Sequence, residues 1–172
     1  MINFLFLKAS TELEELSRKL GYEKTLFLES DFVEVHGSQK EILTQIRRAK
    51  QQKKITVAKP ISEGELRFLL EKTAIDLVYG LEGLHEKDSL YFPRGGLDQV
   101  LCALARGKTI GFSFSNLLNG ADRPRLLQRM MFNMELCRKY NVKSLLSTFA
   151  SNMMDMRATK DLEAVWRVLR KK

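Results

Sequence analysis

Histidine and cysteine are scarce in this sequence, which has two residues of each type. His36 and His85 stand in separate polar segments, and neither has a second His or Cys at the spacing of a metal site. Cys102 and Cys137 fall among apolar residues in helical patterns, where a free thiol behaves as a small buried hydrophobe. We therefore expect two surface histidines and two buried thiols, with no disulfide and no zinc site.

The sequence also lacks the motifs of common enzyme classes. It has no Gly-x-Gly-x-x-Gly and no phosphate-binding loop, and Arg94-Gly95-Gly96 is typical of a turn that leads into a helix. Asp31 and Glu34 lie near His36 in the chain, but no nucleophile accompanies them. The serines Ser113, Ser115, Ser147 and Ser151 have no sequence signature of an activating base. We expect no catalytic residue and no metal ligand in this chain.

Long apolar runs are absent too. None approaches the roughly 20 residues that a membrane-spanning helix needs, and the apolar opening 1–7 lacks the basic start and the length of a secretory signal. A chain of 172 residues that is 44% hydrophobic and 29% charged has enough material for one sizeable core, and no repeat or Pro/Gly/Ser linker divides it. We expect a single cytoplasmic α/β domain, 1–172, with no membrane contact and a basic tail at 167–172.

Positive charge, in contrast, is abundant and unevenly distributed, with a net charge of +8. Residues 101–172 hold 14 Lys and Arg against five acids, whereas the first hundred residues hold 15 against 16. Such asymmetry indicates an anionic partner for the C-terminal part, and nucleic acid is the commonest polyanion for a basic protein. A solvated basic surface that keeps the protein soluble explains the charge equally well.

Short β-branched or aromatic runs alternate with helical periodicity and predict six βα units. The predicted strands are Asn3–Leu7, Thr25–Leu28, Ile55–Ala58, Ile75–Tyr79, Thr109–Phe114 and Ser144–Ser147. The clearest helices are Thr11–Leu20, Gln39–Gln52, Leu97–Ala105 and Asp122–Tyr140. This order needs a parallel sheet with right-handed crossovers. Because a complete TIM barrel takes about 250 residues, the chain predicts a trimmed or irregular barrel, or an open sheet.

Five segments in the second half of the chain carry a family resemblance. They are Gly96–Leu101, Ile110–Ser113 with Leu117-Leu118, Arg125–Leu127 with Met130-Met131, Lys139–Val142, and Ala150 with Met156-Arg157 and Asp161-Leu162. In this order the segments resemble archaeal ribonuclease P protein component three, whose eukaryotic relative is the thirty-kilodalton ribonuclease P subunit. The family's Asp in its first strand is replaced here by the apolar run Phe4–Leu7, which removes the argument for a remnant metal site. The chain also ends before the family's last strand, so we expect a shortened member.

The resemblance implies an irregular or trimmed TIM-barrel-like fold, a metal-phosphoesterase-type barrel without the metal site, with parallel strands and surrounding helices. It implies a non-catalytic subunit of the endoribonuclease ribonuclease P, which supports the catalytic RNA in removing the 5′ leader of precursor tRNA. The implied partners are the ribonuclease P RNA, a smaller ribonuclease P protein and other protein subunits, with precursor tRNA contacted indirectly. The chain itself would bind no cofactor, whereas the catalytic RNA would use Mg²⁺.

Ten basic residues are candidates for contacts with RNA, because Lys and Arg that neutralise phosphates release counterions. They are Arg123, Arg125, Arg129, Arg157, Arg170, Lys171, Lys172, Arg47, Arg48 and Lys50. The three arginines of the longest helix are equally well explained as one solvated helix face. Arg157 is also explained as an anchor for its loop, paired with Asp155 or Asp161.

Two other classes of function stay open. A degenerate metal-dependent phosphoesterase of the same barrel type would bind metal stoichiometrically and act on a phosphate ester, although two histidines are few for such a site. A generic interaction scaffold would bind RNA weakly and without regard to the fold of the RNA.

Overall fold

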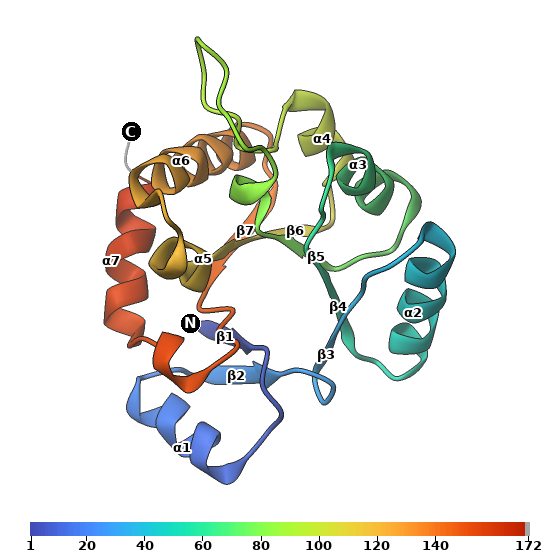
Figure 1. Cartoon of the computed structure of the whole chain (residues 1–172). Coiled ribbons are helices and arrows are strands. Elements are labelled where there is room, and N and C mark those ends of the chain that lie inside the picture. The colour runs from blue at the N-terminus through green and yellow to red at the C-terminus, as the bar shows by residue number, and fades with distance from the viewer. Residues whose placement is uncertain (171–172) are drawn as a thin grey trace.

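Parallel strands and helices alternate along the chain, as the periodicity predicts. The computed structural model describes residues 1–170, and its helices surround the strands (Figure 1). The strands are β1 Ile2–Leu5, β2 Lys24–Phe27, β3 Phe32–Glu34, β4 Ile55–Ala58, β5 Leu77–Tyr79, β6 Thr109–Ser113 and β7 Lys143–Ser147. The α-helices are α1 Thr11–Lys19, α2 Gln39–Gln51, α3 Glu63–Lys72, α4 Gln99–Leu104, α5 Phe114–Asn119, α6 Arg123–Lys139 and α7 Thr159–Arg170, with 3₁₀ turns η1 Leu81–Gly83 and η2 Met153–Asp155.

The strands follow the order of the chain around an irregular barrel. β3 to β7 form one five-stranded parallel sheet, and β1 pairs with β2 in a second parallel sheet. Only residues 28–31 separate β2 from β3, and no helix lies between them. β2 and β3 are therefore two parts of one interrupted strand, of which the first pairs with β1 and the second with β4. The six predicted βα units are confirmed with this interruption.

Side chains hold the seam between β1 and β7, where a single bridge, Leu5 to Ala150, replaces a continuous ladder. Asn3 Oδ1 is buried and accepts hydrogen bonds from the hydroxyl groups of Ser147 at 3.1 Å and Thr148 at 2.6 Å. The backbone N–H of Phe4 donates to Ser147 Oγ at 2.7 Å. These bonds satisfy polar groups that would otherwise be buried without partners. The structure thus has a trimmed, TIM-barrel-like fold.

Aromatic rings fill the interior of the barrel. Tyr79 and Phe149 stack with ring centroids 4.6 Å apart, and Phe4 meets Phe32 edge to face at 5.4 Å. Gly111 on β6 leaves room for this stack, because a Cβ there would lie only 2.9 Å from Cζ of Phe149. The barrel is consequently a packed core and not a channel.

The helices bury apolar faces against the outside of the strands. In α6, Met130, Met134 and Cys137 face inward, as predicted. Cys102 and Cys137 are both buried, and burial raises the pKa of the Cys102 thiol to about 11 and that of the Cys137 thiol to about 12. Both thiols therefore stay protonated near neutral pH and act as core residues. Within residues 1–170, no helix has the length and apolar character needed to cross a membrane.

Candidate nucleic-acid interface

The C-terminal ends of the helices carry most of the exposed positive charge. In a parallel α/β barrel each helix returns the chain to the beginning of the next strand, so these ends and turns gather at one end of the barrel. We call this surface the basic end. Its basic residues are Arg18, Lys19, Lys24, Arg47, Arg48, Lys50, Lys53, Lys54, Lys72, Arg106, Lys108, Arg138, Lys139, Lys143, Arg167 and Arg170. They come from both halves of the sequence, so the charge asymmetry along the chain does not correspond to one half of the surface.

α7 connects two parts of the basic end. The backbone N–H of Thr159 donates to the carbonyl of Leu20 at 2.9 Å, so α7 begins beside the end of α1. At its other end, Arg138 of α6 donates to the carbonyl of Arg170 at 3.3 Å. The Arg170 guanidinium lies over the Trp166 ring, 5.9 Å from its centroid. α7 therefore runs from the end of α1 to the end of α6 and joins two basic parts of this surface.

Few acids oppose this charge. In the last turns of α1, α2, α3, α4, α6 and α7 and in the turns that follow them, the acids within the described part of the chain are Glu23, Glu71 and Asp76. Partial burial tends to raise the pKa of Asp76, but hydrogen bonds from Lys50 and from Thr56 lower it overall. Lys50 is thus neutralised by Asp76, whereas Arg47 and Arg48 remain exposed. Cations at helix ends also interact favourably with the helix macrodipole, so this arrangement is compatible with stable helices.

The predicted RNA-binding candidates fall into two groups in space. Arg47, Arg48, Lys50 and Arg170 lie on the basic end. The predicted candidates Lys171 and Lys172 lie outside the described residues. Arg123, Arg125 and Arg129 lie in the first two turns of α6, and the fold does not bring them to the basic end. Arg157 follows β7, but the hydroxyl of Tyr22 donates to its carbonyl at 2.7 Å, so its backbone lies beside the turn after α1, at the margin of the basic end.

Arg129 is a correction to the sequence analysis, because its side chain is only 3% exposed. Its Nε lies 2.7 Å from Asp88 Oδ1, and its Nη1 donates to the carbonyls of Glu82 at 2.9 Å and His85 at 2.6 Å. Partial burial tends to raise the pKa of Asp88, but the N–H of Arg94 and the Arg129 guanidinium lower it overall. Arg129 therefore holds the start of the long loop between β5 and α4, and it is not available to RNA.

Asn133, one turn later in α6, holds the other end of that loop. Its Nδ2 donates to the carbonyl of Gly95 at 2.5 Å, and its Oδ1 accepts from the N–H of Leu97 at 3.4 Å. The loop projects from the barrel (Figure 1, light green), and its tip exposes Leu90 by 87% and Tyr91 by 88%. α6 thus fixes both ends of a loop that presents apolar side chains to solvent.

Arg125 and Arg157 both make local contacts. Arg125 is half-buried, pairs with Asp122 at 3.2 Å and donates to the carbonyl of Glu86 at 3.4 Å. Arg157 anchors its loop as one interpretation predicts, but through the carbonyls of Met154 and Met156, at 2.6 and 2.7 Å, and not through a carboxylate. Arg123, the first residue of α6, is exposed.

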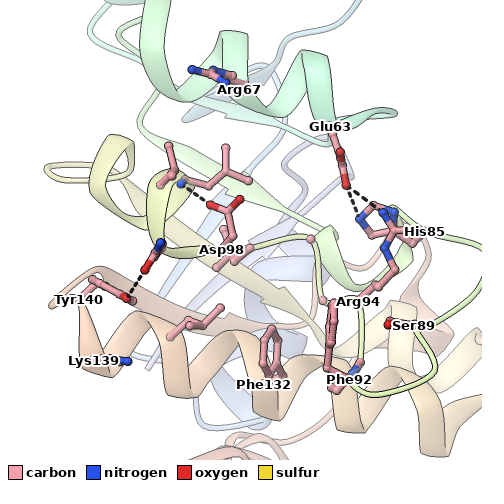
Figure 2. A pocket seen from close by; sticks show the side chains of 18 residues that line it. Glu63, Arg67, His85, Ser89, Phe92, Arg94, Asp98, Phe132, Lys139 and Tyr140 are labelled. Atoms are coloured by element: carbon pink, nitrogen blue, oxygen red, sulfur yellow. Dashed lines mark hydrogen bonds and ion pairs between the residues drawn. The ribbon is translucent and has the colours of Figure 1, made fainter.

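His85 is a second correction, since its side chain is 13% exposed and lies in a cleft of about 860 Å³ beside the projecting loop. Its Nε2 is 3.1 Å from Glu63, which also pairs with Arg94 at 3.4 Å (Figure 2). Burial, together with the positive charge of Arg94, lowers the pKa of His85. The imidazole is therefore neutral at physiological pH. His36 is exposed, as expected.

The sequence analysis missed most of the basic end, although the sequence contains the signal. Arg18-Lys19, Arg106 with Lys108, and Arg138-Lys139 each stand at or just after the end of a helix. In a repeated βα pattern, residues in such equivalent positions share one end of the fold. The basic residues at the helix end of each βα unit, taken together, therefore predict this surface. Over residues 1–170, no three His, Cys, Asp or Glu side chains are grouped so that they could hold a metal ion.

Comparisons with known proteins identify the fold. No protein-family model matches the chain, and a search of the curated proteins found no match. A chain in the cryo-EM structure of archaeal ribonuclease P with mature tRNA is similar with a TM-score of 0.79 and 20% sequence identity, over 99% of this chain and 83% of that chain. A crystal structure of an uncharacterised protein is similar with a TM-score of 0.50 and 9% identity, over 77% of this chain and 32% of that chain. The expected trimmed TIM-barrel-like fold is thus confirmed.

Proposed function

We propose that this chain is a non-catalytic protein subunit of an archaeal-type ribonuclease P, which supports a catalytic RNA in removing the 5′ leader of precursor tRNA. The observation that carries the proposal is the structural likeness, over 99% of this chain, to a chain in archaeal ribonuclease P with mature tRNA. The five segments that resemble ribonuclease P protein component three support it independently, since that likeness lies in the amino-acid sequence and not in the fold. The basic end supplies the surface that such a role needs.

The basic end is suited to the phosphate backbone of a folded RNA. Its cations are spread over the ends of six helices, and each phosphate that they neutralise releases counterions. Side chains cannot easily reach the bases in the deep groove of an A-form helix, so contacts of this kind depend on the backbone and on shape. A protein that bridges neighbouring RNA helices lowers the repulsion between their phosphates, and this is the contribution that we assign to the chain.

In this role the chain would act with an RNA, with other protein subunits and with Mg²⁺ bound by the RNA. The ribonuclease P RNA would contact the basic end, and a smaller ribonuclease P protein and other subunits would bind elsewhere on the barrel. Precursor tRNA would be contacted only indirectly. The chain would need no cofactor of its own, whereas the catalytic RNA would use Mg²⁺, and the complex would act in the cytoplasm.

Reconstitution tests the proposal. The purified chain is added to cognate ribonuclease P RNA, with and without the smaller protein partner, and cleavage of 5′-labelled precursor tRNA is followed at moderate Mg²⁺. We expect faster cleavage when both proteins are present and no cleavage by either protein without the RNA. A variant with Arg47→Gln, Arg48→Gln and Arg106→Gln should stimulate less than the unmodified chain at the same concentration.

Two outcomes would reject the subunit role. In the first, the folded chain neither stimulates the RNA nor binds the protein partner. In the second, the chain cleaves a phosphate ester without RNA and loses this activity on treatment with a chelator, which would favour the phosphoesterase alternative.

A further inference from the structure

The opposite end of the barrel contains a separate pocket of about 740 Å³. It lies where β4, β5, β6 and β7 reach their C-terminal ends, and Lys59, Glu82, Ser115 and Asp155 are among the residues that line it. This is the position at which barrel proteins bind their ligands, since the loops that follow the strands meet there. None of the residues of the basic end lines this pocket.

A completely buried carboxyl group is the most unusual feature of the pocket. Glu82 is 0% exposed, and its Oε1 accepts a hydrogen bond from Asn116 Nδ2 at 3.2 Å. Its Oε2 is buried and has no hydrogen-bond partner among the described residues, nor has the buried Oγ of Ser115. Buried polar atoms without partners are uncommon in folded proteins and need an explanation. A ligand that donates hydrogen bonds in this pocket would supply the missing partners.

The charged residues that line the pocket favour a positively charged ligand. Glu34 and Asp155 line it together with Glu82, and Lys59 is the one basic residue among its lining residues. Tyr79 donates its hydroxyl hydrogen bond to Glu34 Oε1 at 2.8 Å, which keeps this carboxylate in the pocket. Acids thus outnumber cations, so a phosphate or another anion would be repelled.

The walls of the pocket distinguish an organic cation from a metal ion. Phe6, Tyr79 and Phe149 line the pocket, and aromatic rings attract alkylammonium and guanidinium groups. Over residues 1–170, no group of three His, Cys, Asp or Glu is arranged to hold a metal ion. Aromatic side chains that surround a bound ammonium group are a known mode of organic-cation recognition, and the carboxylates of this pocket add acceptors for its N–H groups.

We propose that this pocket binds a compact organic cation, a guanidinium or a primary ammonium, with Glu82 as its buried acceptor. The burial of Glu82 supports this, because burial raises the pKa of the carboxyl and a cation beside it would restore the ionised form. The cation can belong to a free diamine or to an arginine or lysine side chain of a protein. The proposal does not depend on the role in ribonuclease P.

Titration of the whole protein with three probes tests the site: agmatine, putrescine, and Nα-acetyl-arginine methylamide as a mimic of a protein side chain. Binding is followed by calorimetry and by chemical shifts of labelled backbone amides up to about 10 mM, the range in which weak small-ligand sites saturate. We expect at least one probe to saturate and to shift the amides of Gly80, Glu82 and Asn116. Tighter binding of the arginine mimic indicates a protein side chain as the source, and tighter binding of the diamines indicates a free amine.

Three variants make the test specific. Glu82→Gln, which keeps the size of the side chain, should weaken binding by at least tenfold, and Lys59→Met should strengthen it by removing the opposing charge. Glu135→Gln, an exposed acid on α6, is the matched control and should leave binding unchanged. If Glu82→Gln fails to fold, Glu34→Gln gives the same readout, with a threefold or greater loss expected. Absence of saturable binding by every probe, or equal binding by Glu82→Gln and the folded control, would overturn the proposal.

Discussion

Replacing Arg129 by Met should destabilise the fold, because Arg129 is a buried structural residue and not an RNA contact. The substitution removes the charge and the hydrogen bonds to Asp88 and to the carbonyls of Glu82 and His85. Breaking one partner of a buried ion pair costs about 3–5 kcal/mol. Asp88 keeps its bond from the N–H of Arg94 and is 25% exposed, which places the loss near the lower limit, at about 3 kcal/mol.

Chemical denaturation followed by circular dichroism measures this loss. For a chain of this size it corresponds to a fall in Tm of roughly 6–12 °C. Arg123→Met is the control, since Arg123 is exposed on the same helix and its loss should change stability by less than about 0.5 kcal/mol. A loss below about 1 kcal/mol for Arg129→Met, combined with weaker RNA binding, would refute the structural role and restore Arg129 as an RNA contact.

Three further predictions concern the core. Burial raises the folded-state pKa of Glu82, so its protonation contributes stability that is complete below the unfolded-state pKa and is lost as the pH rises through the folded-state pKa. The free energy of unfolding should therefore decline above about pH 5, and Glu82→Gln should flatten this decline. Denaturation curves recorded over a series of pH values measure the effect. Gly111→Ala should cost about 1–3 kcal/mol in thermal unfolding, because its methyl group would lie 2.9 Å from Cζ of Phe149; a neutral effect would mean that the aromatic stack yields easily. Cys102 and Cys137 should react with a disulfide reagent at pH 8 only after denaturant is added, and rapid reaction of the native protein would contradict their burial and raised pKa values.

The sequence was sufficient to predict the order of strands and helices because each βα unit has a local pattern. Apolar runs marked the strands, and the inward stripe of α6, with Met130 and Met134, followed from helical spacing. β3 was missed because it has only three residues, follows the turn that contains Glu29 and Asp31, and ends in a polar residue. β3 forms because it pairs with β4, which lies far from it in the sequence, and local patterns do not report such a contact.

Local periodicity also explains why Arg129 was misplaced. The spacing of α6 places Arg129 on the flank of the inward stripe that contains Met130 and Met134, where a basic residue usually meets solvent. Here the segment from residue 82 to residue 97 folds over that side of the helix and brings Asp88 and the carbonyls of Glu82 and His85 to the guanidinium. The same long-range packing buries Glu82 completely, so the pocket at the strand ends could not be predicted from spacing. The basic end was predictable, because helix ends in a βα repeat share one side of the fold.

The salt dependence of binding to cognate ribonuclease P RNA tests whether the basic end is the surface that contacts RNA. Two triple variants that each lose three positive charges are compared with the unmodified chain over a range of salt concentrations. The basic-end variant carries Arg47→Gln, Arg48→Gln and Arg106→Gln, and the control carries Lys40→Gln, Lys87→Gln and Arg123→Gln from the other end of the barrel. We expect that only the basic-end variant flattens the slope of log affinity against log salt, by about 0.7–0.9 per lost phosphate contact. Equal flattening by both variants, or a change in the control alone, would contradict this expectation.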